Sequence, residues 1–207
     1  MRKSETKILV ALLLFISVIK NIIGKTRPLP IKVYKKFKKA FPTLTEQQYL
    51  NAQIIVNTAF AQTQTEQQIV YFLATAYGSS RLFPVKERLA KAGSKVRKYQ
   101  EKYWDTGYYG RGYVQITWKR SYEEFQGILG IDLINHPELA LNPFIASEVM
   151  IVGMRRGLFS IEGKNKLDDY LGPGKYDFYN ARRTVWTTHD AEMYEAISLL
   201  IFNQKVE

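Results

Sequence analysis

Three polar side chains in the middle of the chain have the chemistry of a sugar site. Glu87 closes the segment FPVKE, and Gln115 and Thr117 lie in the segment YYGRGYVQITW, residues 108–118. Because side chains alternate along an extended strand, Gln115 and Thr117 should point to one face. An amide and a hydroxyl can hydrogen-bond sugar hydroxyls, and a carboxylate can serve as an acid or base. The pattern therefore suggests one wall of a glycan-binding site.

Aromatic residues and glycines surround these polar groups. Gly110 and Gly112 bracket Arg111, which allows close backbone approach. The rings offer flat apolar faces on which sugars stack, and they are Tyr108, Tyr109, Tyr113 and Trp118. The alternative is an ordinary amphipathic hairpin whose apolar face belongs to the core.

Glu87 also has a plain structural interpretation. The segment VKERLAK can begin a surface helix in which Glu87 pairs with Lys91, four residues further on. Metal chemistry is not indicated, because the chain has no cysteine and its two histidines, His136 and His189, lack the spacing of metal ligands. We expect no metal and no cofactor. His136 fits a helix start capped by Asn135.

The elements that must position these residues are mostly helical. Helical spacing and capping patterns, among them Thr45 with Gln48 and Thr63 with Glu66, predict helices over 45–61, 63–77, 119–129, 142–157, 165–170 and 190–203. Residues 92–107 are polar and should form a loop, and residues 108–118 should form a hairpin. The predicted class is mainly α with one small β-hairpin.

The first 44 residues differ from the rest in composition. Residues 1–25 contain the apolar run ILVALLLFISVI, and residues 8–24 as a helix would extend about 26 Å, close to a hydrocarbon core of about 30 Å. No small-x-small cleavage site follows it, which favours an uncleaved signal anchor over a signal peptide. A buried or partner-facing helix is the alternative.

Residues 26–44 form a predicted basic connector before a domain at 45–207. Seven lysines and arginines and no acid lie within 25–41, and the net charge of the chain is +11. Such a run favours anionic partners, namely lipid head groups or wall polymers, although a solvated linker explains it equally well. No other feature supports nucleic acid.

Several motifs in order resemble the family-19 glycoside hydrolases, the chitinase-like and phage-endolysin-like members of the lysozyme superfamily. GRGYVQITWKRSY resembles the hairpin of that family, and FLATAY and FPVKE resemble the segments before and after its catalytic acid. INHPELALNPFIASEVMIVGMRRGLFS and DFYNARRTVW resemble its core helix and its Asn-Ala-Arg-Arg segment. The resemblance covers roughly residues 45–200.

The resemblance implies a two-lobed, lysozyme-like helical fold. It also implies an enzyme that cleaves β-1,4-linked N-acetylhexosamine chains in chitin or peptidoglycan with inversion of the anomeric configuration. Glu87 would stand at the position of the general base, and Thr117 would help to hold the attacking water. The other implied substrate-binding residues are Gln115, Tyr109, Trp118, Asn180 and Arg182.

The sequence departs from the family pattern where the general acid belongs. The family has a His-Glu pair directly after the helix end, and this chain has Gly78-Ser79 there. A hydroxyl is too weak an acid to protonate a leaving group near neutral pH. Ser121 and the segment VWTTHDA, residues 185–191, also replace usual family residues. Glu101 or Asp105 could supply a substitute acid.

Whether the chain is an enzyme therefore stays open at this stage, with the missing acid arguing against it. The favoured hypothesis is a membrane-anchored, single-pass pseudoenzyme that faces the periplasm or cell exterior and binds a glycan or assembles with other membrane proteins. An active inverting hydrolase and a structural subunit of a membrane complex are the alternatives.

Overall fold

The computed structural model describes residues 28–62, 64–160, 163–185 and 188–207. The elements follow in this order: α2 (Pro28–Ala40), α3 (Glu46–Ala61), α4 (Glu66–Ser80), β1 (Val85–Lys86), α5 (Lys95–Gln100), η1 (Trp104–Thr106), β2 (Arg111–Gly112), α6 (Lys119–Leu129), η2 (Pro137–Leu141), α7 (Pro143–Arg156), α8 (Leu167–Tyr170), β3 (Leu171–Gly172), β4 (Lys175–Tyr176), η4 (Asn180–Thr184) and α9 (Ala191–Phe202). The predicted anchor, residues 1–25, lies outside these ranges. Within them, no helix is both long and apolar enough to cross a membrane.

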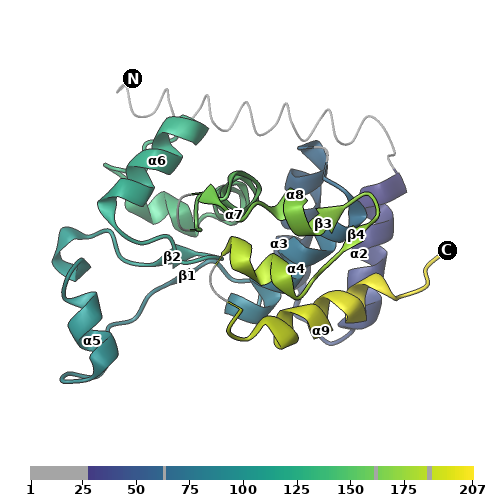
Figure 1. Ribbon diagram of the computed structural model, residues 1–207, viewed down its shortest axis with the longest axis horizontal. Helices are drawn as coiled ribbons and strands as arrows, with labels where there is room; N and C mark the ends of the chain where they lie inside the picture. Colours follow the sequence, from purple (N-terminus) through teal and green to yellow (C-terminus); the bar gives the residue numbers. More distant parts are fainter. Residues whose placement is uncertain (1–27, 63, 161–162, 186–187) are drawn as a thin grey trace.

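Helix α4 is the centre of the main core. Every residue from Gln67 to Ala76 is buried, and α4 packs against α9, α3 and α2 (Figure 1). A helix that is apolar on all sides must be covered on all sides, which explains why EQQIVYFLATAY lies inside the molecule. Each fully buried Leu, Ile or Phe here contributes about 1.5–3 kcal/mol. This burial keeps the end of α4 in one position.

Helix α4 begins and ends later than its sequence pattern predicts. The capping box uses Thr65 and Gln68 rather than Thr63 and Glu66. The helix continues to Ser80, because Arg81 adopts a left-handed conformation (φ 53°) and closes the helix there. The Gly-Ser-Ser stretch is therefore the last turn of the helix, beyond the predicted end at residue 77.

The basic stretch before residue 45 contains a packed helix. Val33 and Phe37 of α2 are fully buried in the main core. Lysines on one face of α2 donate hydrogen bonds to backbone carbonyls at the C-terminal end of the chain: Lys35 to Glu207, Lys36 to Phe202 and Lys39 to Lys205. Lys36 satisfies a carbonyl that the end of α9 leaves without a helical partner, and Lys35 and Lys39 hold the residues that follow the helix. This part of the predicted connector is thus integrated into the folded unit.

A second, smaller core holds α6, η2 and α7 together. Its buried residues are Ile116, Tyr122, Phe125, Leu133, Ala140 and Val149. In Figure 1 this region and α5 lie to one side of the molecule, and α2, α4 and α9 lie to the other. The cleft that the resemblance implies between two lobes stays a prediction.

Two small antiparallel sheets replace the single predicted hairpin. Strand β1 pairs with β2, with Val85 opposite Gly112, and β3 pairs with β4. Within 108–118 only a bridge between Arg111 and Ile116 is formed. Gln115 has a φ of 55°, so the chain turns there and the strand alternation assumed for Gln115 and Thr117 does not hold.

Other predicted elements differ in detail. Helices over 119–129, 142–157, 165–170 and 190–203 are confirmed within a few residues as α6, α7, α8 and α9. The predicted loop 92–107 contains α5, capped by the side chain of Ser94, and η1. His136, not Asn135, occupies the cap position of η2, and Asn135 instead bonds to Asp132.

Candidate functional site

Glu87 hydrogen-bonds to Gly110 through both its backbone and its side chain. Its N–H donates to the Gly110 carbonyl over 2.8 Å, and its Oε2 accepts the Gly110 N–H over 2.8 Å. Strand β1 ends one residue earlier, and its pairing with β2 brings these two residues together. The carboxylate is therefore held at the junction of two chain segments.

Two further donors hold the other oxygen of Glu87. Oε1 accepts hydrogen bonds from Gln100 Nε2 and from the Tyr103 hydroxyl, each 2.8 Å long. Gln100 is buried and also bridges Ala90 and Arg88 of the loop after Glu87. Charge-assisted bonds of this kind are among the stronger ones in proteins. With the Gly110 N–H, they fix the orientation of the carboxylate.

The Tyr103 hydroxyl stays protonated at neutral pH. Burial raises its pKa above the ordinary tyrosine range, and the hydrogen bond and negative charge of Glu87 raise it further. Tyr103 is thus a permanent donor to Glu87. Neither Gln100 nor Tyr103 was predicted as a site residue, because residues 92–107 read as a polar loop and carried no pattern that linked them to Glu87.

Gln115 lies against the same glycine. A Cβ at Gly110 would come within 2.8 Å of Gln115 Oε1 and 3.1 Å of Glu87 Oε2. Gln115 Nε2 donates to the carbonyls of Val85 and Gly112, each over 2.8 Å. The structure therefore brings Gln115 and Glu87 together, and the donors of this amide are used inside the protein.

Aromatic side chains flank the Glu87 cluster. Trp118 packs edge-on against Tyr103 and Tyr99, with ring centroids 5.0 and 6.3 Å apart. Trp118 is 39% exposed and Tyr99 is 52% exposed, so both present ring surface to solvent. Exposed rings beside a fixed carboxylate suit stacking on sugar faces.

Tyr109 belongs to a second aromatic group on the same segment. Its ring stacks on Trp104 with centroids 4.5 Å apart, and the Arg111 guanidinium lies 4.0 Å from its centroid. The Lys86 ammonium lies 5.0 Å from the ring centroid and lowers the pKa of Tyr109 most, against the opposing effect of burial, and Arg111 lowers it further. Thr117 donates its hydroxyl to the Gln115 carbonyl over 3.0 Å.

Asn180 and Arg182 have contacts in another part of the fold. The Asn180 amide donates to Asp177, and the Arg182 guanidinium lies 4.1 Å from the ring centroid of Tyr194. The Tyr194 hydroxyl is 3.0 Å from Ser79 Oγ at the end of α4. Among the described residues, no hydrogen bond or ion pair joins Asn180 or Arg182 to Glu87.

The two suggested substitute acids face solvent. Glu101 is exposed and pairs with Arg97 over 3.2 Å, and Asp105 is exposed in η1. No group of acidic, histidine or cysteine side chains with the arrangement of a metal site occurs in the described ranges.

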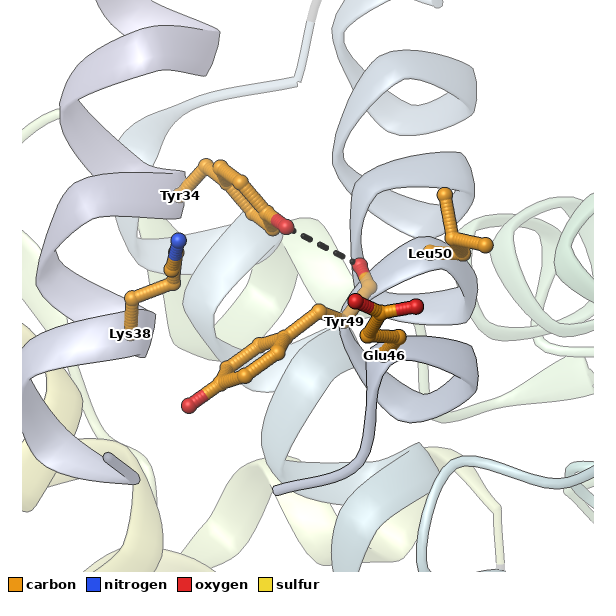
Figure 2. Close-up of a pocket in the computed structure, with 5 residues that line it drawn as sticks. All are labelled: Tyr34, Lys38, Glu46, Tyr49 and Leu50. Atoms are coloured by element: carbon orange, nitrogen blue, oxygen red, sulfur yellow. Dashed lines mark hydrogen bonds between the residues drawn. The ribbon is translucent and has the colours of Figure 1, made fainter. Parts of the chain in front are cut away.

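A surface hollow of about 260 Å³ lies between α2 and α3, and none of the predicted site residues lines it (Figure 2). Its lining consists of Tyr34, Lys38, Glu46, Tyr49 and Leu50. The Lys38 ammonium lies 5.2 Å from the ring centroid of Tyr49. We assign no ligand to this hollow.

Comparison with solved structures identifies the fold. The chain is similar to a bacterial family-19 chitinase, at 18% identity over 81% of this chain and 93% of the other, with a TM-score of 0.50. It also matches chitinase C from Streptomyces griseus HUT6037, at 23% identity, 58% and 64% coverage and a TM-score of 0.40. A point variant of a chitinase C matches at 18% identity, 84% and 93% coverage and a TM-score of 0.47.

No protein-family model and no curated protein matches the chain. The first of these structures shows that the chain has the helical, lysozyme-like fold of family-19 chitinases, as its motifs predicted. At this level of identity they establish the fold alone.

Proposed function

We propose that this chain is a glycosidase-like domain that binds a β-1,4-linked N-acetylhexosamine glycan, chitin or peptidoglycan, and has lost hydrolysis. The observation that carries the proposal is the Glu87 cluster: a carboxylate held by Gln100, Tyr103 and Gly110 beside the exposed ring of Trp118. A fixed acceptor next to an exposed ring suits a sugar with polar edges and apolar faces.

Loss of hydrolysis rests on the need for two carboxylates. An inverting glycosidase uses an acid and a base about 6.5–9.5 Å apart. At the end of α4, where the resemblance expects the acid, Ser79 bonds to Tyr194. Glu101, one of the two substitute acids, is already paired with Arg97 at the surface. Glu87 therefore lacks an evident second carboxylate that would protonate the leaving group.

An activity assay separates binding from turnover. Purified protein is incubated with chitin oligomers and peptidoglycan, beside Glu87→Gln and the matched control Glu124→Gln on α6. We expect no product from any of the three. Product formed by the parent and by Glu124→Gln but not by Glu87→Gln would overturn the pseudoenzyme proposal in favour of the active hydrolase.

A binding assay tests the glycan surface. Trp118→Ala should weaken binding of chitin oligomers at least tenfold, because it removes an exposed stacking ring. The control Tyr176→Ala removes an exposed ring of β4 and should leave the affinity unchanged. Absence of binding by the parent would contradict the glycan proposal and favour a structural subunit.

We further propose that residues 1–25 anchor the domain in a membrane, with the domain on the periplasmic or extracellular side. The apolar run and its basic flanks support this proposal. The full chain should float with lipid vesicles, and a variant that lacks residues 1–25 should not. Equal flotation of both forms would contradict the proposal that residues 1–25 are the anchor.

A further inference from the structure

One face of α4 carries hydroxyl groups at intervals of four residues. Tyr71, Thr75 and Ser79 follow one another along this face, since residues four apart on a helix are neighbours. Tyr71 and Thr75 are fully buried, and neither hydroxyl has a hydrogen-bond partner within the described parts of the chain. Ser79, at the end of the face, is exposed and bonds to the Tyr194 hydroxyl.

Arg182 of η4 is connected to the Ser79 end of this face through Tyr194. Its guanidinium stacks on the Tyr194 ring, 4.1 Å from the centroid, and Tyr194 in turn contacts Ser79. Burial has the largest effect on the Tyr71 pKa and raises it, whereas the charge of Arg182 lowers it. The positive charge is therefore within electrostatic reach of the buried Tyr71 hydroxyl.

Two nitrogens of this guanidinium are also without hydrogen-bond partners. Arg182 Nε and Nη1 are both buried, and neither donates to any acceptor among the residues that the structure describes. No carboxylate lies within ion-pair distance of this side chain in the same ranges. More than 90% of buried polar groups in proteins have a partner, and an unpaired one costs about 1–3 kcal/mol.

These groups have one chemistry in common. The two guanidinium nitrogens can only donate, and the two hydroxyls are free to donate. A ligand that satisfies all of them must accept several hydrogen bonds and offset a positive charge. A water molecule meets the first requirement but not the second, whereas a small anion meets both.

We propose that Arg182, Tyr71 and Thr75 form a binding site for one small monovalent anion, a halide or a short carboxylate such as formate, between α4 and η4. The exposed end of the face at Ser79 provides the route from solvent. A carboxylate at position 79, where the chitinase resemblance expects the general acid, would be an internal partner for the same donors. No hydrogen bond or ion pair joins these residues to Glu87 among the described residues, and the test below does not require the protein to bind a glycan.

Thermal unfolding of the full chain tests the site. Sodium chloride and sodium formate are titrated separately at constant ionic strength, which is kept with the bulky sulfonate MES. At least one of the two anions should raise Tm in a saturable manner, by about 5–10 °C at a hundred times its dissociation constant. A difference between the chloride and formate curves identifies the preferred class. If neither anion raised Tm above the MES control, water alone would fill the site and the proposal would be overturned.

Two pairs of variants locate the effect. Arg182→Met should abolish the anion-dependent rise, whereas Arg183→Met, at the exposed neighbour, should keep it. Ser79→Glu should have a higher Tm than the parent in MES alone and should no longer respond to chloride or formate. Ser80→Glu, one position along the helix, should respond as the parent does.

The Ser79→Glu pair keeps the test decisive if Arg182→Met does not fold. An unchanged anion response in Ser79→Glu, or equal responses in Arg182→Met and Arg183→Met, would overturn the proposal. Neither result depends on whether the protein binds a glycan, so failure of this site is distinct from failure of the proposed function.

Discussion

At the scale of single residues, Gly110 decides whether Glu87 can be held as it is. The Gly110 N–H and carbonyl both bond to Glu87, and a Cβ added at Gly110 would lie 2.8 Å from Gln115 Oε1. A side chain at this position would enter the space between the two polar groups. Gly110 does not have a positive φ, so its backbone conformation does not demand glycine. What the site requires at this position is the absence of a Cβ.

Gly110→Ala should destabilise the fold by about 1–3 kcal/mol, because the added Cβ would meet Gln115 Oε1 at 2.8 Å. The matched control is Gly127→Ala in α6, where a Cβ has no neighbour within 4 Å. That variant should gain about 0.5–1 kcal/mol from helix propensity. Urea denaturation measures both, and equal effects of the two would show that the contact at Gly110 is unimportant.

At the scale of elements, α2 shows how a basic run can serve the fold. Lys36 is buried, lies 2.7 Å from Glu66 Oε1 at the start of α4, and donates to Phe202 at the end of α9. One side chain thus ties three helices together. The positive charge of the basic run suggested an anionic partner, but the charge of Lys36 pairs with Glu66 inside the protein.

Lys36→Met should destabilise the protein by about 2 kcal/mol or more, because it leaves the Glu66 carboxylate largely buried with a weaker partner. Lys32→Met is the control: Lys32 pairs with the same carboxylate but is half exposed, so its loss should cost less than about 1 kcal/mol. Chemical denaturation distinguishes them. A larger loss for Lys32→Met would contradict this account.

The same pair predicts behaviour in acid. Burial tends to raise the pKa of Glu66, but the hydrogen bonds and charges of Lys36 and Lys32 outweigh it and the pKa is lowered. Stability from this pair is thus complete above the unfolded pKa, about 4.3, and is lost as pH falls through the lower folded value. Unfolding of Lys36→Met should therefore depend less on pH below about 4.

At the scale of the whole molecule, buried tyrosines should set the alkaline limit of stability. Burial raises the pKa of Tyr71, Tyr103 and Tyr113, and raises that of Tyr122 to about 12. The unfolded value is about 10, so this stability is complete below pH 10 and is lost as pH rises above it.

Tyr113→Phe isolates one of these tyrosines. The Tyr113 hydroxyl is buried and has no hydrogen-bond partner in the described ranges, so its removal should cost little at pH 7. Above pH 10, the variant should lose stability more slowly than the parent, by up to about 1.4 kcal/mol per pH unit. Tyr176→Phe, at an exposed ring, is the control. Identical pH dependence in Tyr113→Phe and the parent would disprove the assignment.

Local sequence signals predicted much of the helical framework. Asn142 with Pro143 marks the start of α7, Gly157 marks its end, and Thr45 with Gln48 caps α3, because each signal acts through hydrogen bonds within a few residues. The ordered motifs also predicted the chitinase-like fold. The start of α4 was misplaced because two threonine pairs, two residues apart, satisfy the same capping rule.

The sequence by itself determined most of the helices, the candidate carboxylate Glu87 and the aromatic residues around it, because those depend on residue type and short spacing. Only the tertiary structure decided that Gln100 and Tyr103 hold Glu87, that Arg182 instead lies beside Tyr194, and that the α2 lysines bind the C-terminal end. These contacts join residues from 12 positions apart, Arg182 and Tyr194, to 172 positions apart, Lys35 and Glu207. No local pattern encodes such partners, since they result from how the helices pack around α4.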